Sequence, residues 1–197
     1  MLRHVPELLL TQGQLLWAVN YGREPDIRLR NHVRYLRALD IPPATTRQAS
    51  GPGKSIAYDF FDLIEGGIAV TGLDLGFRPK DIAALLVKQR GEMRSLYANT
   101  WRELPTAAID QDWVKSRSRI VPILGDEIFI RLHDRRSEKW GQVDVVNPEE
   151  ASERLPAFEP VERFFDEAPR RLLPLKRLMR QWVGWAMEAP PINPGRQ

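Results

Sequence analysis

Closely spaced arginines in the first third of the chain are the residues best able to do chemistry in this sequence. Between Tyr21 and Lys54 there are seven basic and three acidic residues, so this segment carries +4 in a chain of 197 residues whose formal net charge is +3. Lysine and arginine bind polyanions favourably because counterions are released on binding. The segment therefore favours a polyanionic partner at one face of the protein. A solvated arginine-rich surface is the alternative that charge alone leaves open.

A helix predicted over Asp26–Asp40 carries most of these residues. Apolar residues at helical spacing are expected on its buried side, namely Ile27, Leu29, Val33, Leu36 and Leu39. The remaining side carries Arg28, Arg30, Asn31, Arg34, Tyr35 and Arg37. Pro42 and Pro43 end the helix, because proline has no N–H to donate.

A short helix is predicted before the basic helix and a β-hairpin after it. The first covers Thr11–Asn20, with Thr11 as its cap. In the turn that follows, Gly22 can adopt a positive φ. Residues 44–58 predict a hairpin whose tip is rich in Gly, Pro and Ser.

Two longer helices are predicted next. Asp59 is expected to cap the first, and Gly76 to end it. The second begins at Pro79, which suits the first position of a helix, and runs to about Leu104. Its apolar seam comprises Ile82, Leu85, Leu86, Gln89, Met93, Leu96 and Thr100.

The pattern changes in the second half of the chain. Residues 119–134 and 139–146 alternate as strands do, and 174–188 predict an amphipathic helix. We expect residues 112–189 to form a small α+β module of unknown role and 190–197 to be a disordered tail. The fold class predicted for the whole chain is mainly α with small β.

Three short motifs make the sequence resemble the N-terminal DNA-binding domain of the MerR family of bacterial transcription regulators. "VRYLRALDIPP" is similar to the family's recognition helix, "SIAYD" to the end of its wing, and "LGFRPKDIAALL" to the turn and acidic helix start that follow. The similarity covers Leu15 to Leu86, with sixteen residues between Tyr58 and Leu75. The wing has an additional Gly-Pro-Gly tip. Other departures are Leu36, Arg37 and Asp40, where the family commonly has an aromatic residue, an acid and a glycine.

The resemblance implies a winged helix-turn-helix in residues 1–78 and a dimerisation helix in residues 79–104. It implies double-stranded DNA as the partner, a homodimer as the binding species, and transcription activation as the favoured outcome. RNA polymerase or another protein is the candidate partner of the C-terminal module. The residues expected at the DNA are Arg28, Arg30, Asn31, Arg34, Tyr35, Arg37, Arg47, Gly53, Lys54 and Tyr58. For Tyr58, a phosphate contact and packing of the wing onto the core are both open.

Several other classes of function are not expected. The chain has no cysteine and three scattered histidines, so thiolate metal sites and a helical histidine pair are absent. "SGPGKS" ends like a phosphate-binding loop, but Gln48 stands where that motif needs its first glycine. We therefore predict no enzyme, metal or cofactor. No apolar stretch is long enough to span a membrane, and we expect a cytoplasmic, nucleoid-associated protein.

Two alternatives to a transcription regulator stay open at this point. One is a phage-type excisionase, packaging or architectural DNA-binding protein, since these share the winged fold. The other is a protein-interaction module without a DNA role, in which the arginines would bind an acidic protein surface.

Overall fold

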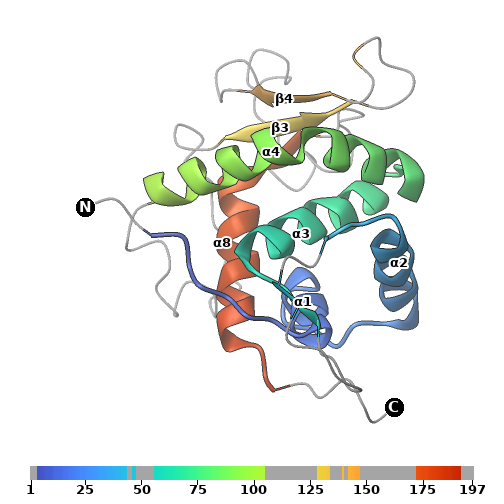
Figure 1. Cartoon of the computed structure of the whole chain (residues 1–197), viewed down its shortest axis with the longest axis vertical. Helices are drawn as coiled ribbons and strands as arrows, with labels where there is room; N and C mark the ends of the chain where they lie inside the picture. Colours follow the sequence, from blue (N-terminus) through green and yellow to red (C-terminus); the bar gives the residue numbers. More distant parts are fainter. Residues whose placement is uncertain are drawn as a thin grey trace, which may run out of the picture.

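The described part of the protein, in a computed structural model, comprises residues 4–43, 46–47, 56–104, 128–133, 139, 142–146 and 172–191. Within it the chain is mainly helical, with five helices, a two-stranded sheet and a three-stranded antiparallel sheet (Figure 1). The class predicted from the sequence, mainly α with small β, is confirmed at this level. The expected tail beyond residue 191 lies outside the described residues.

Helices α1 (Gln12–Val19) and α2 (Ile27–Ala38) begin at strong local caps. The Thr11 hydroxyl accepts a hydrogen bond from the Gln14 N–H, and the Gln14 side chain accepts one from the Thr11 N–H. Asp26 caps α2 by accepting the Leu29 N–H at 2.7 Å. These contacts satisfy N–H groups that lack partners inside the helix. The short polar motifs therefore set where both helices start.

The turn between α1 and α2 uses two residues with positive φ. Gly22 has φ 71°, as the sequence predicts, and Tyr21 has φ 54°. A Cβ built on Gly22 would lie 2.4 Å from the Trp185 ring. Both the conformation and the close approach therefore require glycine at this position.

A short hairpin follows α2, as predicted. Strand β1 (Thr46–Arg47) pairs antiparallel with β2 (Ile56–Ala57), and the tip between them lies outside the described residues. The backbone of Tyr58 exchanges two hydrogen bonds of 2.9 Å with Leu10. The end of the hairpin is thus fixed to the segment that leads into α1.

Helices α3 (Phe60–Asp74) and α4 (Pro79–Glu103) pack side by side across the middle of the molecule (Figure 1). Asp59 caps α3, and Gly76 follows its end with φ 86°. Pro79 stands in the first turn of α4. The start and end signals predicted for these helices are confirmed.

The apolar seam of α4 lies in the chain's own core. Ile82, Leu85, Leu86 and Met93 are all buried, and α4 contacts α2, α3 and α8. Among the described large hydrophobic residues of α4, Val87 is the exposed one, at 43%, and it lies on the outer side of the helix. The seam expected to form a dimer is therefore already used within one chain.

Helix α8 (Leu175–Glu188) belongs to the same hydrophobic core as α1 and α3. It follows β5 (Leu172–Pro174), the edge of a sheet in which β3 (Phe129–Leu132) lies between β4 (Val143–Val146) and β5. Figure 1 shows α8 running past α1 and α3, with the sheet above α4. The sequence predicts a separate module for this helix, whereas in the structure one continuous core joins it to the N-terminal helices.

The contact between α3 and α8 is close enough to exclude a side chain. A Cβ on Gly67 would lie 2.7 Å from the Trp182 ring, and Trp182 is completely buried. The neighbouring Gly66 is different, since its Cβ would meet Leu15 and Pro42 at 3.7 Å, an ordinary van der Waals distance. Of the two adjacent glycines, only Gly67 is required by packing.

We predict opposite effects of alanine at these two glycines. Gly67→Ala should lower the free energy of unfolding by about 1–3 kcal/mol, because the methyl group overpacks the contact with Trp182. Gly66→Ala should leave stability unchanged or raise it by up to about 1 kcal/mol, because alanine is the better helix former. Urea denaturation of both variants measures this. Equal effects at both sites would contradict the packing of α8 on α3.

Candidate nucleic-acid interface

One side of α2 faces solvent along the whole helix. At 3.6 residues per turn, six exposed residues fall within roughly a third of the circumference. This exposed face of α2 consists of Ile27, Arg28, Asn31, Arg34, Tyr35 and Ala38. Val33 and Leu36 on the opposite side are buried and hold the helix to the core. Figure 1 places α2 at the edge of the molecule.

The polar side chains of this face are free. Arg28, Asn31, Arg34 and Tyr35 make no side-chain hydrogen bond or ion pair with one another or with any other described residue. Tyr35 is 44% exposed, so its ring and hydroxyl are both within reach of a ligand. An exposed face with unpaired arginines has its full donor capacity available to an external partner.

The three nearby acids form no ion pair with Arg28 or Arg34 among the described residues, because each has a different contact. Glu24 forms an ion pair of 2.8 Å with Arg30. Asp26 accepts the Leu29 N–H as the cap of α2. Asp40 pairs with an arginine of α4. All three acids counted in the sequence segment are therefore committed within the protein.

Arg30 and Arg37, two predicted site residues, have contacts inside the fold. Arg30 donates to the Pro25 carbonyl oxygen at 3.1 Å as well as to Glu24. Arg37 donates from Nη1 to Gln12 Oε1 at 2.6 Å, which ties α2 to the start of α1. These two arginines support the position of α2, whereas Arg28 and Arg34 are available at its surface.

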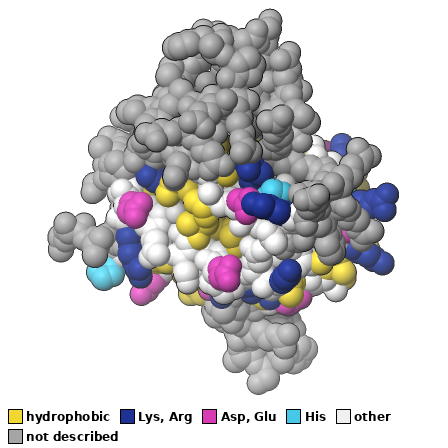
Figure 2. All heavy atoms as spheres, turned by 90° about the horizontal axis from the view of Figure 1, so that it is seen from above, with side chains coloured by type: hydrophobic (Ala, Val, Ile, Leu, Met, Phe, Trp, Pro, Cys, Tyr) yellow, Lys and Arg dark blue, Asp and Glu magenta, His cyan; other side chains and the backbone are white. Residues whose placement is uncertain are grey.

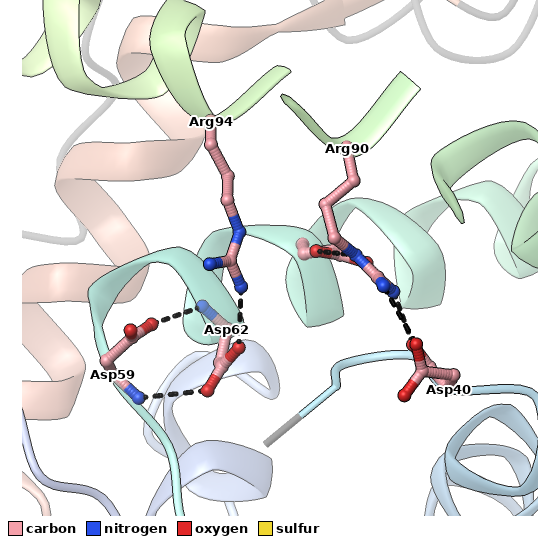
Figure 3. A network of polar contacts seen from close by, with 6 residues as sticks. Asp40, Asp59, Asp62, Arg90 and Arg94 are labelled. Atoms are coloured by element: carbon pink, nitrogen blue, oxygen red, sulfur yellow. Dashed lines mark hydrogen bonds and ion pairs between the residues drawn. The ribbon is translucent and has the colours of Figure 1, made fainter. Parts of the chain in front are cut away.

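An ion-pair network that includes the buried Glu65 holds the end of α2 (Figure 3). Arg90 of α4 binds the Asp40 carboxylate at 2.8 Å and the Glu65 carboxylate of α3 at 2.9 Å. Asp40 has φ 63°, the conformation that glycine favours. This explains how an aspartate stands where the resembled family has glycine, since aspartate tolerates that region better than most residues.

Glu65 depends on Arg90 for its charge. Its side chain is only 3% exposed. Burial raises the pKa of Glu65 above its ordinary value of 4.5, and the hydrogen bond and charge of Arg90 act in the opposite direction. A buried carboxylate without a partner is strongly unfavourable.

A second polar cluster fixes the beginning of α3 beside this network. Asp59 and Asp62 form a reciprocal capping box, with N–H to carboxylate distances of 2.9 and 3.2 Å. Arg94 of α4 reaches the buried Asp62 at 3.2 Å (Figure 3). Two arginines one turn apart on α4 therefore hold α3, and one of them also holds the end of α2.

Tyr58 is not part of the exposed surface. It is 1% exposed, its hydroxyl has no hydrogen-bond partner, and burial raises its pKa. Of the two roles considered from the sequence, the structure shows the packing role, and a phosphate contact is wrong for this arrangement. The backbone of Arg47 lies in β1, but its side chain, Gly53 and Lys54 lie outside the described residues.

Sequence reasoning placed Ile27 on the wrong side of α2. It is 72% exposed and lies in line with Asn31 and Arg34 instead of Val33 and Leu36. The angular position was available from the sequence, since Ile27 and Asn31 are four residues apart and Ile27 and Arg34 seven. Apolar character was given more weight than that angle.

Charged side chains are unevenly distributed on the face of the molecule that Figure 2 shows. Seen from above in Figure 2, basic side chains gather at the edge on the same side as α2 and the start of α4 in Figure 1, while acidic and basic groups are mixed elsewhere. None of the described helices has both the length and the apolar character of a membrane span.

Comparisons with known proteins add no further assignment. No family model matches this chain, and the search of curated proteins found no match.

We predict that Arg90→Met lowers the free energy of unfolding by about 3 kcal/mol at pH 7, because it leaves Glu65 buried and unpaired. Losing Arg90 raises the pKa of Glu65 further, so the cost is full above that raised pKa and fades as the pH falls below it, because Glu65 of the folded variant is then protonated. Chemical denaturation at pH 7 and pH 5 measures the deficit.

The matched control is the double variant Glu65→Gln/Arg90→Met. It should recover part of the loss at pH 7 and show little dependence of the deficit on pH. A deficit of Arg90→Met that is equal at both pH values would contradict the role of Arg90 in compensating the buried carboxylate.

Proposed function

We propose that the protein is a sequence-specific transcription regulator that binds double-stranded DNA, with α1 and α2 as a helix-turn-helix and the β1–β2 hairpin as its wing. The observation that carries the proposal is the exposed face of α2, where Arg28, Asn31, Arg34 and Tyr35 have no side-chain partner among the described residues. An α-helix fits the major groove of DNA, and these side chains match the groups displayed there.

Each free side chain has a role in this proposal. Arg28 and Arg34 bind guanine through O6 and N7 or bind the flanking phosphates. Asn31, between them on the same face, has the paired donor and acceptor that recognise adenine. Tyr35 donates its hydroxyl to a phosphate oxygen. Together they combine sequence readout with the positioning contacts that fix the register of the helix.

The fold prepares α2 for this role before DNA arrives. Arg37 ties it to α1 through Gln12, and Arg90 fixes the residue that follows its last turn. A recognition element that is already rigid loses little conformational entropy on binding. The contacts within the fold therefore contribute to affinity without touching the ligand.

Regulation itself is proposed on the resemblance to the MerR family, which implies activation by distorting promoter DNA. RNA polymerase or another protein would be the second partner. Homodimerisation on a two-fold symmetric site stays a prediction. A dimer would need a surface other than the inner seam of α4, which is buried in each chain.

The decisive experiment selects binding sites from a random duplex library with the full chain, and then measures Arg34→Ala on the selected site. We expect roughly 10- to 100-fold weaker binding, the value of one arginine–guanine contact of about 1–3 kcal/mol. The melting temperature should not change, because Arg34 is exposed and unpaired. Lys88→Ala, on the exposed side of α4, is the control and should leave both quantities unchanged.

Other outcomes would favour other functions. Absence of any selected sequence, with no duplex binding at about 150 mM salt, would overturn the proposal in favour of binding to an acidic protein surface. Genomic footprints confined to attachment or packaging sites would instead indicate a phage-type or architectural protein. A large stability loss in Arg34→Ala without a binding defect would contradict the assignment of the site.

Two tyrosine variants test whether the exposed Tyr35 or the buried Tyr58 contacts the DNA. Tyr35→Phe should weaken binding to the selected site roughly three- to tenfold, because it loses one hydrogen bond to a charged phosphate. Tyr58→Phe should bind as the wild type does and be no less stable, since the Tyr58 hydroxyl is buried without a partner. A binding defect in Tyr58→Phe at unchanged stability would show that Tyr58 reaches the DNA after all.

A further inference from the structure

The most exposed of the large hydrophobic side chains that the structure describes is Ile27, at 72%. It is the first residue of α2, directly after the capping Asp26. Leu29, Val33 and Leu36 already provide the packing of this helix against the core. The position of Ile27 therefore has no explanation in the stability of the fold.

Ile27 lies at the N-terminal end of the exposed face of α2. Counting along the helix, Ile27, Asn31, Arg34 and Ala38 form one row, with Arg28 and Tyr35 beside it. The row is thus apolar at its first position, polar in its middle and small at its last. Because Ile27 begins the helix, it is the member nearest to the N-terminal end, which recognition helices direct at base edges.

A protein partner is a weaker explanation of this residue. Interaction surfaces on proteins are centred on clustered apolar and aromatic side chains. The neighbours of Ile27 on its own face are Arg28, Asn31 and Arg34, all polar and all free. The surroundings of Ile27 are cationic and hydrogen-bonding, which complements DNA.

The major-groove edges of DNA offer an apolar side chain one favourable contact, the C5-methyl group of thymine. Phosphates carry charge, the other base edges display mainly hydrogen-bonding groups, and the sugars are the same for every base and carry no sequence information. We infer that Ile27 is a specificity-determining residue, which selects a thymine next to the base pairs that Asn31 and Arg34 contact. This inference rests on the proposed function and names one element of its target sequence.

The experiment removes single methyl groups from the DNA. Each thymine of the selected site is replaced in turn by uracil, which keeps every hydrogen-bonding group and loses only the methyl. We expect the wild type to bind roughly fourfold more weakly at one such position, the value of about one buried CH2 group. Ile27→Ala should show a similar loss on the unmodified site and no further loss with uracil there, since the two changes remove the same contact.

Two controls isolate the contact. Val87→Ala shortens a half-exposed aliphatic side chain on α4 and should retain the full sensitivity to uracil. Melting temperatures of both variants should match that of the wild type, because neither side chain is in the core.

The two proposals fail in different ways. Tight, sequence-specific binding in which every thymine tolerates uracil would overturn the role of Ile27 and leave the proposed function intact. A uracil effect that persists in Ile27→Ala would do the same. Failure to bind any duplex would overturn the proposed function and, with it, this inference.

Discussion

The arrangement of the N-terminal helices depends on the guanidinium of Arg90. It comes from the middle of α4, binds a carboxylate of α3 that is almost completely buried, and reaches both the side chain and the backbone carbonyl oxygen of Asp40. Arginine suits this position because its planar fork can donate to several oxygens at once and stays charged at any physiological pH. The network fixes the end of α2 relative to α3 and α4. The exposed face of α2 is therefore presented at a defined angle, which a helix held by apolar packing alone would specify less well.

The second constraint is the single core that joins the two ends of the chain. Trp182 of α8 lies against Gly67 of α3, and Trp185 lies against Gly22 in the turn between α1 and α2. One aromatic helix therefore touches both the central helix and the turn that orients α2. The N-terminal helices share their hydrophobic core with residues that come more than a hundred positions later. A truncated N-terminal fragment would expose the buried surface that α8 covers, so the region of resemblance to the MerR family does not coincide with a structural unit.

Local features of the fold could be predicted from the sequence, while contacts between distant residues could not. Thr11, Asp26 and Asp59 cap helices as their residue types indicate, and Gly22 and Gly76 have the positive φ expected of them. These depend on a few neighbouring residues and leave a clear pattern. The contact of Arg37 with Gln12 and that of Arg90 with Asp40 each join residues 25 or more positions apart, and no spacing rule indicates them. The burial of Tyr58 could not be predicted for the same reason. An aromatic residue after a strand can lie at the surface or in the core, and which one occurs depends on contacts with distant residues, such as the backbone pairing of Tyr58 with Leu10.

The candidate site stays a prediction, and the sequence could define it only in part. Counting charges indicates a basic segment but not which of its arginines are free of ion pairs, because that depends on where the acidic side chains lie in the fold. Arg30 is used by Glu24, while the carboxylates of Asp26 and Asp40 are used by a helix end and by α4. What is left is a face with two unpaired cations, an amide and a phenol, with an exposed isoleucine at its N-terminal end. No other described residue pairs with these polar side chains, and the proposed DNA partner rests on their mixture of charged, hydrogen-bonding and apolar groups. The acids near α2 thus leave Arg28 and Arg34 without an ion pair among the described residues, because each acid is held in a different contact.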